Sequence, residues 1–301
     1  MSKKILITGS QGQLGTALQK KLNDKFNILP TDKIISESLN NKKFRHLDIT
    51  ERKNVETLIG EFQPDIIINC ASYTDVDGCE KNKDQAHLIN VVGLKNLIHA
   101  SGYGTYFIHI SSDYVFDGKN GPYSEEDPTY PLNYYGKTKL ESENILRGSR
   151  RKYLIIRSNV IYSENILFKS NFFSWIYKSL FNNKSIYVVN DQTSNPTYVA
   201  HLVLVIFRCV ILNIEGIYHY GSDDYLSRHE FAMAIARNFK FDESLIEPIT
   251  TEELIKYIPS YIAKRPMNSG LATFKIEDEI DLAVYSTDYS LALLKKSLLS
   301  I

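Results

Sequence analysis

The sequence predicts an α/β protein with a doubly wound parallel sheet and a smaller, mixed C-terminal lobe. Three observations carry this prediction. Short apolar runs alternate with segments of helical period through the first half of the chain. Runs such as IIIN at 66–69 and YLII at 153–156 are almost continuously apolar, as expected for strands buried on both faces. A glycine-rich turn follows the first run, where a strand would pass into a helix.

The elements of the first half follow in order. KILITG at 4–9 is the first expected strand, and Leu14, Leu18 and Leu22 then keep a 3.6-residue period that predicts a helix. Five further strands are expected at 26–32, 44–49, 65–72, 106–116 and 153–162. Since helical segments separate these runs, the strands should lie parallel.

The second half, after about residue 163, is less regular. Residues 191–207 read as a loop followed by a helix, and Ser227 stands three residues before Glu230, a capping-box spacing that predicts another helix start. We therefore expect this half to form the smaller lobe over the sheet.

Composition excludes several classes of protein. The chain has 35 basic and 35 acidic residues, so no net field favours nucleic acid or an anionic membrane, and any anionic ligand must be held by local groups. The longest apolar run, at 202–207, is far shorter than the roughly 20 residues of a membrane span. Cys70, Cys79 and Cys209 lack paired spacing, which favours reduced thiols and a cytoplasmic location. No metal site is predicted.

The turn GSQGQLG at 9–15 indicates a dinucleotide site of the Rossmann type. Gly9, Gly12 and Gly15 would allow a tight turn and a close approach of the backbone to a pyrophosphate at the helix N-terminus. The intervening Gln11, Gln13 and Leu14 belong to the same loop. Because the pattern lies between an expected strand and an expected helix, it is a strong signal.

Acidic residues after the next two strands are candidates for the adenosine end of the cofactor. Asp32, at the end of the second strand, would accept hydrogen bonds from a ribose and repel a 2′-phosphate, so NADH is slightly favoured over NADPH. A role for Asp32 as a turn residue, with Lys33 beside it, remains open. Asp48 and Ile49 are candidates for adenine contacts.

Tyr135 and Lys139 are four residues apart at an expected helix start, so their side chains should point to the same place. A nearby ammonium would favour the phenolate and lower the pKa of Tyr135, which could then exchange a proton with a substrate oxygen. Ser112 lies at the carboxyl end of a strand, where ligands of parallel sheets bind, and could hydrogen-bond the same oxygen.

Together these motifs resemble the extended short-chain dehydrogenase/reductase superfamily and, more narrowly, the dTDP-4-dehydrorhamnose reductase family. The resemblance covers nearly the whole chain. It rests on GSQGQLG, LDIT at 47–50, CASYTDVDGCE at 70–80, NVVGLKNL at 90–97, SSDYVFDG at 111–118, YYGKTKLESE at 134–143, DQTSNPTY at 191–198 and RPMNSGL at 265–271.

The resemblance implies NAD(P)H-dependent reduction of the C4 ketone of a nucleotide-linked 4-keto-6-deoxy sugar, with Tyr135 as proton donor. Lys139 would tune Tyr135 and hold the cofactor ribose, Ser112 would orient the carbonyl, and Asn90 would support a water-linked proton path. The cofactor channel would include Cys70, Ala71, Ser72, Tyr73 and Thr74. The sugar nucleotide would be faced by Asp113, Tyr114, Phe116, Asn159, Val160, Arg265 and Asn268.

Two departures from the family pattern limit what is carried over. Val160 stands where family members commonly place a tryptophan near the sugar, so the identity of the sugar stays open. Ala17 stands where some members carry a glutamate of a metal-linked dimer, so that dimer is not expected.

Two other functions remain as alternatives. A sugar-nucleotide 4-epimerase uses the same Ser, Tyr and Lys, and relatives of this family serve as non-catalytic, dinucleotide-binding regulatory subunits. For Arg265, a phosphate contact and a surface salt bridge are both open.

We expect residues 1–162 with about 192–212 to form the NAD(P)-binding domain, and residues 163–191 with 216–301 to form the substrate-binding lobe. The expected partner is a nucleotide-sugar substrate, with neither nucleic acid nor membrane, and a homodimer remains open.

Overall fold

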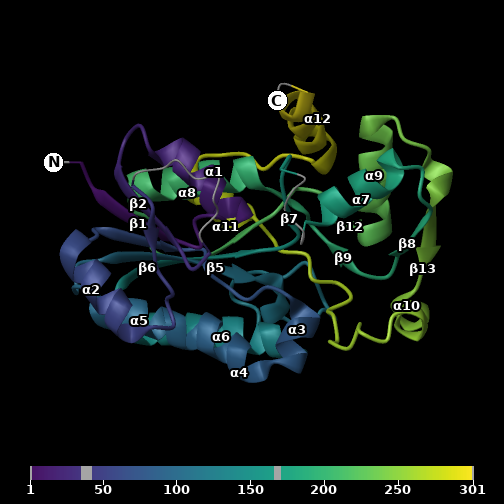
Figure 1. Ribbon diagram of the computed structural model, residues 1–301. Coiled ribbons are helices and arrows are strands. Elements are labelled where there is room, and N and C mark those ends of the chain that lie inside the picture. The colour runs from purple at the N-terminus through teal and green to yellow at the C-terminus, as the bar shows by residue number, and fades with distance from the viewer. Residues whose placement is uncertain (1, 35–42, 166–170, 300–301) are drawn as a thin grey trace.

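The computed structural model describes residues 2–34, 43–165 and 171–299. A seven-stranded parallel sheet in the order β11-β6-β5-β4-β1-β2-β3 crosses the molecule (Figure 1). Its strands are β1 (Lys4–Thr8), β2 (Asn27–Asp32), β3 (Arg45–His46), β4 (Ile66–Asn69), β5 (Tyr106–Ser112), β6 (Lys152–Ser158) and β11 (Gly216–Tyr220). The predicted doubly wound parallel sheet is confirmed.

The strand order reverses beside β1, which pairs with β2 on one side and with β4 on the other. In open parallel sheets, ligands bind outside the carboxyl ends of the strands at such a reversal. The residues that follow β1 and β4 are the glycine turn from Gly9 and the segment from Cys70, so the fold brings these two predicted motifs to one place.

Alternate side chains of each strand serve opposite faces of the sheet, as the two-residue period requires. In β1, for example, Ile5 and Ile7 join one buried cluster while Leu6 joins the other. Helices α1 (Gln13–Leu22), α8 (Val199–Leu212) and α11 (Phe274–Ile280) lie over one face (Figure 1). The other face carries α2 (Arg52–Phe62), α3 (Val76–Lys81), α4 (Lys83–His87), the π-helical turn η1 (Leu88–Val92), α5 (Gly93–Ala100) and α6 (Tyr134–Gly148). The short 3₁₀ turn η2 (Asp113–Val115) follows β5 directly.

The C-terminal lobe is mixed, as predicted. Outside the seven-stranded sheet, short strands pair in twos: β7 (Ile161–Tyr162) with β10 (Thr197–Tyr198), β9 (Thr193–Ser194) with β12 (Leu226–Ser227), and β8 (Ile186–Val189) with β13 (Ile246–Ile249). The β9–β12 pair is antiparallel and the other two are parallel. The helical elements of the lobe are α7 (Phe172–Phe181), α9 (Arg228–Phe239), η3 (Glu243–Leu245) and α10 (Thr251–Tyr257), and α12 (Thr287–Leu299) ends the described chain. The capping box of Ser227 and Glu230 starts α9, as the spacing predicted.

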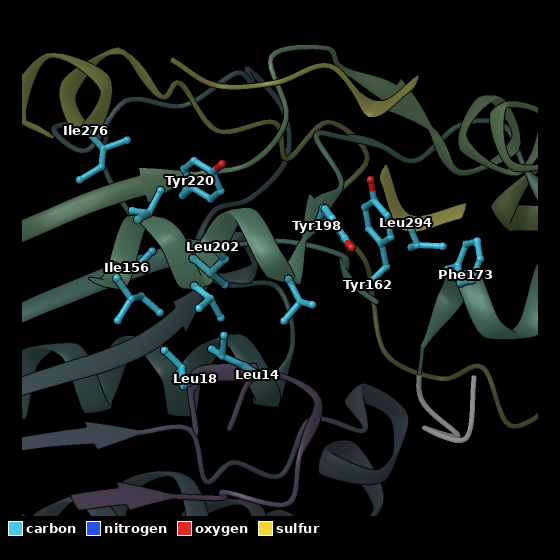
Figure 2. Packing of buried hydrophobic residues seen from close by; sticks show 14 of the residues in the cluster. Leu14, Leu18, Ile156, Tyr162, Phe173, Tyr198, Leu202, Tyr220, Ile276 and Leu294 are labelled. Carbon is cyan, nitrogen blue, oxygen red and sulfur yellow. The ribbon is translucent and has the colours of Figure 1, made fainter. Parts of the chain in front are cut away.

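The main hydrophobic cluster runs without a break from the sheet into the lobe. Figure 2 shows Leu14 and Leu18 of α1 near Leu202 of α8, and Tyr162 between Tyr198 and Leu294 farther along the same cluster. The lobe therefore shares its core with the sheet domain. β11, which falls within the predicted lobe, extends the sheet: it pairs with β6 along its length, from Gly216 beside Leu154 to Tyr220 beside Ser158.

None of the helices in the described parts of the chain is long and apolar enough to cross a membrane.

Candidate active site

A cavity of about 520 Å³ lies at the carboxyl ends of β1, β4, β5 and β6. Fifteen of the predicted site residues line it: Gly9, Gly12, Gln13, Leu14, Gly15, Cys70, Ser72, Thr74, Ser112, Asp113, Tyr114, Tyr135, Lys139, Asn159 and Val160. They come from the first half of the chain, and Phe172 and Arg228 of the second half also line the cavity. The structure therefore joins the glycine loop and the Tyr135/Lys139 motif in a single space.

The glycine loop has the geometry of an anion site. Gly9 has φ +61°, and a Cβ placed there would lie 2.6 Å from the backbone nitrogen of Ala71. A Cβ on Gly15 would lie 2.6 Å from Cα of Ser10. The N-cap of α1 is Gly12, so no side chain caps the first turn in the described structure, and no acidic residue stands in that turn. A helix end of this kind favours a phosphate, which fits a dinucleotide.

The predicted adenosine-end residues do not line the cavity, and of these Asp32 contacts the glycine loop. Asp32 ends β2, and its Oδ2 accepts a hydrogen bond from the backbone N–H of Gln11 at 2.9 Å. Asp48 forms an ion pair with Lys33 at 2.7 Å. The Ile49 side chain is buried in the hydrophobic cluster on the α2 and α5 side of the sheet, and its adenine contact stays a prediction.

Ser112, Asp113 and Tyr135 form a compact polar group. Ser112 and Tyr135 share a hydrogen bond. The Ser112 hydroxyl donates to Asp113 at 2.9 Å, and the hydroxyl of Ser269 donates to the other oxygen of Asp113 at 2.6 Å. Burial raises the pKa of Asp113 to about 6, although these hydrogen bonds lower it. Ser269, in the segment RPMNSGL, was missed as a site residue.

The pKa of Tyr135 departs from its usual value in the direction opposite to the one predicted from Lys139. Burial raises the pKa of Tyr135 above its usual value, the charge of Asp113 raises it further, and the hydrogen bond with Ser112 only partly offsets them. The ammonium of Lys139 instead donates to the carbonyl oxygen of Ile110 at 2.5 Å. Burial lowers the pKa of Lys139 to about 8, against the charge of Glu143, which raises it. For both Tyr135 and Lys139, desolvation shifts the pKa more than the neighbouring charges do.

Asn90 lies behind the cavity wall and fixes its shape. It is buried in the π-helical turn η1, a local feature that often marks functional sites. Its Oδ1 accepts from the Ser72 hydroxyl at 2.9 Å and from the Tyr73 N–H at 2.7 Å, while its amide donates to Thr138 Oγ1 at 2.9 Å. Asn90 thus ties a strand end to the turn of α6 that carries Lys139.

Tyr114 and Val160 line the predicted sugar side of the cavity. The ring of Tyr114 meets that of Tyr135 edge on, with centroids 5.8 Å apart. Val160 has φ +41°, which is unfavourable for a β-branched residue, and its carbonyl accepts from Thr197 N at 3.3 Å beside the short β7–β10 pair.

Three predicted sugar-nucleotide residues do not line the cavity. Phe116 is fully buried and stacks on Tyr123 with ring centroids 4.2 Å apart. Asn268 donates from its side chain to the Gly121 carbonyl at 2.8 Å. Arg265 forms two hydrogen bonds to Asp77, at 2.8 Å and 2.5 Å, so of its two readings the structure supports the salt bridge. The partners of Asn268 and Arg265 are distant in sequence, whereas Tyr123 is seven residues from Phe116.

Arg228 lines the cavity and was missed by the sequence analysis. It is the first residue of α9, directly after the Ser227 cap, and only the cap was recognised from the sequence. A cation at the first position of a helix is unusual, because the helix dipole disfavours it there. This unusual position was the sequence feature that could have pointed to Arg228 as a site residue. Phe172, at the start of α7, lines the same wall.

The fold and this cavity define a dinucleotide-binding protein of the short-chain dehydrogenase/reductase class. The chain belongs to the dTDP-4-dehydrorhamnose reductase family: the family model described as RmlD substrate binding domain matches residues 3–298. This confirms the resemblance seen in the sequence.

Individual relatives include enzymes and a protein named as a subunit. The dTDP-4-dehydrorhamnose reductase of Aggregatibacter actinomycetemcomitans is 35% identical, over 91% of this chain and 92% of that protein. Methionine adenosyltransferase 2 subunit beta of Xenopus tropicalis is 33% identical, over 91% of this chain and 82% of that protein. The crystal structure of dTDP-4-dehydrorhamnose reductase from Bacillus anthracis in complex with NADP has a TM-score of 0.88 and 32% identity, covering 99% of this chain and 100% of that one.

Proposed function

We propose that this protein reduces the C4 ketone of a nucleotide-linked 4-keto-6-deoxy sugar with NAD(P)H. The observation that carries the proposal is the single cavity in which Ser112, Tyr135 and Lys139 lie with the glycine loop. The identity of 35% to a dTDP-4-dehydrorhamnose reductase over 91% of the chain supports the same reaction class.

Each of the three residues has a role that its surroundings support. A reduced nicotinamide supplies a hydride when bound. Tyr135, kept as a neutral phenol by its raised pKa, donates a proton to the ketone oxygen. Ser112 shares a hydrogen bond with Tyr135, and its hydroxyl would turn from Asp113 to donate to the same ketone oxygen. Lys139 carries an ammonium below about pH 8 and supplies donors to a ribose.

The chain's own residues favour a dinucleotide with a free ribose 2′-hydroxyl. The loop from Gly9 to Gly15 would receive the pyrophosphate, and Asp32 would accept from the ribose while repelling a 2′-phosphate. Lys33 is engaged by Asp48 and so does little to offset that repulsion. NADH is therefore proposed as the preferred cofactor, although a similar solved structure is a complex with NADP.

A regulatory role is the second candidate. The 33% identity to a methionine adenosyltransferase subunit favours it, since a subunit of this fold can bind a dinucleotide without turnover. Turnover distinguishes the two functions.

The test is oxidation of NADH and of NADPH with dTDP-, GDP-, CDP- and UDP-linked 4-keto-6-deoxy sugars. We expect one of these to be reduced, and Tyr135→Phe to lower kcat by about 100- to 10,000-fold, the usual contribution of a positioned acid. Tyr134→Phe is the matched control, because Tyr134 precedes Tyr135 in α6 but does not line this cavity. Dinucleotide binding without any reduction would favour the regulatory role, and full activity of Tyr135→Phe would refute the proton-donor assignment.

A further inference from the structure

A nucleotide-linked sugar brings a diphosphate into the site, and the chain must provide a cation for it. The balanced charges of the sequence give no general attraction for anions, so the cation has to be local. Among the described residues that line the cavity, Lys139 and Arg228 are the cationic side chains. Lys139 lies deep in the cavity wall, 3% exposed, and its ammonium donates to a backbone carbonyl.

Arg265, which the family resemblance pointed to, is already engaged. Asp77 accepts two hydrogen bonds from its guanidinium and two more from the backbone N–H groups of Ile262 and Ala263, at 2.8 Å and 2.9 Å. The guanidinium also lies over the ring of Tyr261, 3.6 Å from its centroid. These contacts engage Arg265 within the protein, and its side chain does not line the cavity.

Arg228 has the opposite surroundings. In residues 2–34, 43–165 and 171–299, no carboxylate forms an ion pair with its guanidinium. Its charged group lies over the ring of Phe172, 5.7 Å from the centroid, and Phe172 in turn stacks on Phe231. Contact with a ring face orients a guanidinium without using its N–H donors. Arg228 is thus a positioned cation with donors left for a ligand.

The position of Arg228 separates it from the cofactor's own phosphate site. The glycine loop joins β1 to α1 in the sheet domain, whereas Arg228 begins α9 in the lobe (Figure 1). The charge of Arg228 acts on Asp113 and Tyr114, which line the sugar side of the cavity. The capping box of Ser227 and Glu230 already satisfies the helix end, so the guanidinium provides the free donors.

We propose that Arg228 binds the diphosphate of the sugar-nucleotide substrate, with Phe172 holding its guanidinium toward the cavity. This inference rests on the proposed function, because it assumes a nucleotide-linked sugar. A planar guanidinium suits bidentate contact with phosphate oxygens, and a partly desolvated pair of this kind is among the stronger polar contacts in proteins.

The test measures binding of dTDP, UDP, GDP and CDP, and of the matching monophosphates, by calorimetry to protein saturated with its preferred dinucleotide. Saturation prevents these probes from occupying the cofactor site. We expect at least one diphosphate to bind more tightly than its monophosphate, and Arg228→Gln to raise its Kd by about ten- to a hundredfold. Arg228→Lys keeps the charge but loses the bidentate geometry, and should give an intermediate Kd. Arg237→Gln is the matched control, because Arg237 lies on the same helix, largely exposed, in an ion pair with Glu243.

Three results would overturn the inference: an unchanged Kd in both Arg228 variants, an equal loss in Arg237→Gln, or no diphosphate binding by the saturated wild-type protein. Should Arg228→Gln fail to fold, loss of the diphosphate preference in Arg228→Lys carries the test. Failure of the proposed function would look different, since diphosphate binding would depend on Arg228 while no 4-keto sugar was reduced.

Discussion

Replacing Glu143 by Gln should destabilise the protein severely, because it leaves a buried arginine without its counterion. Glu143 and Arg157 are 0% and 3% exposed, and their paired atoms lie 2.7 Å and 3.0 Å apart. Among the described residues, no other carboxylate lies within ion-pair distance of Arg157. Arg157 also contacts the ring of His219 at 3.3 Å, and burial lowers the pKa of His219 to about 3, so that ring is neutral at pH 7.

The magnitude follows from the geometry. At 2.7 Å and an effective dielectric constant of about 20, the attraction is about 6 kcal/mol, and dehydration of both groups offsets part of it. Removal of one partner of a buried pair costs about 3–5 kcal/mol, because the other charge is left buried and unpaired. We expect that loss in the free energy of unfolding of Glu143→Gln, measured by urea denaturation followed by circular dichroism.

Two further variants test whether the loss of stability comes from the unpaired buried charge of Arg157 and not from the substitution in general. Glu61→Gln makes the same change in the exposed pair of Arg45 and Glu61, with N···O 3.0 Å and exposures of 56% and 57%, and should cost less than about 1 kcal/mol. The double replacement Glu143→Leu with Arg157→Met should recover most of the stability, since no buried charge remains unpaired. Equal losses in Glu143→Gln and Glu61→Gln would refute the reasoning.

Two other predictions concern the site. Gly9→Ala should weaken NAD(P)H binding at least about tenfold and destabilise the fold by more than about 1 kcal/mol, because φ is +61° and the new Cβ would lie 2.6 Å from Ala71 N. The control Gly60→Ala, in α2 with open space around it, should be neutral or stabilising by up to about 1 kcal/mol. Fluorescence titration and thermal unfolding of both variants check this, and equal behaviour would contradict it. The free energy of unfolding of Asp113→Asn, relative to that of wild type, should rise by about 3 kcal/mol from about pH 4 to about pH 7.5. The folded pKa of Asp113, about 6, is raised above its unfolded value, so ionisation destabilises the wild type as pH rises through this window. Parallel pH curves of the two proteins in urea denaturation would disprove it.

Local sequence was sufficient for the features that depend on neighbouring residues. The alternation of apolar runs with helical periods predicted the parallel sheet, because strand and helix patterns are set by residues a few positions apart. The loop from Gly9 to Gly15 and the spacing of Tyr135 and Lys139 were recognised in the same way, and both line the cavity.

Long-range contacts decided the rest. Arg265 meets Asp77 across 188 positions and Asn268 meets Gly121 across 147, and neither side chain lines the cavity. The sequence pattern after residue 163 did not show that β11 extends the sheet, since strand partnership depends on the packing of the whole chain.

The chain by itself thus determined the fold class and the family, and it indicated the side chains proposed to react, since each is written in short motifs. Tertiary structure alone decided which cation faces the cavity and how burial shifts the pKa values of Asp113, Tyr135 and Lys139. The physical reason is that desolvation and ion pairing depend on which groups fold around a side chain, and these groups come from distant parts of the sequence.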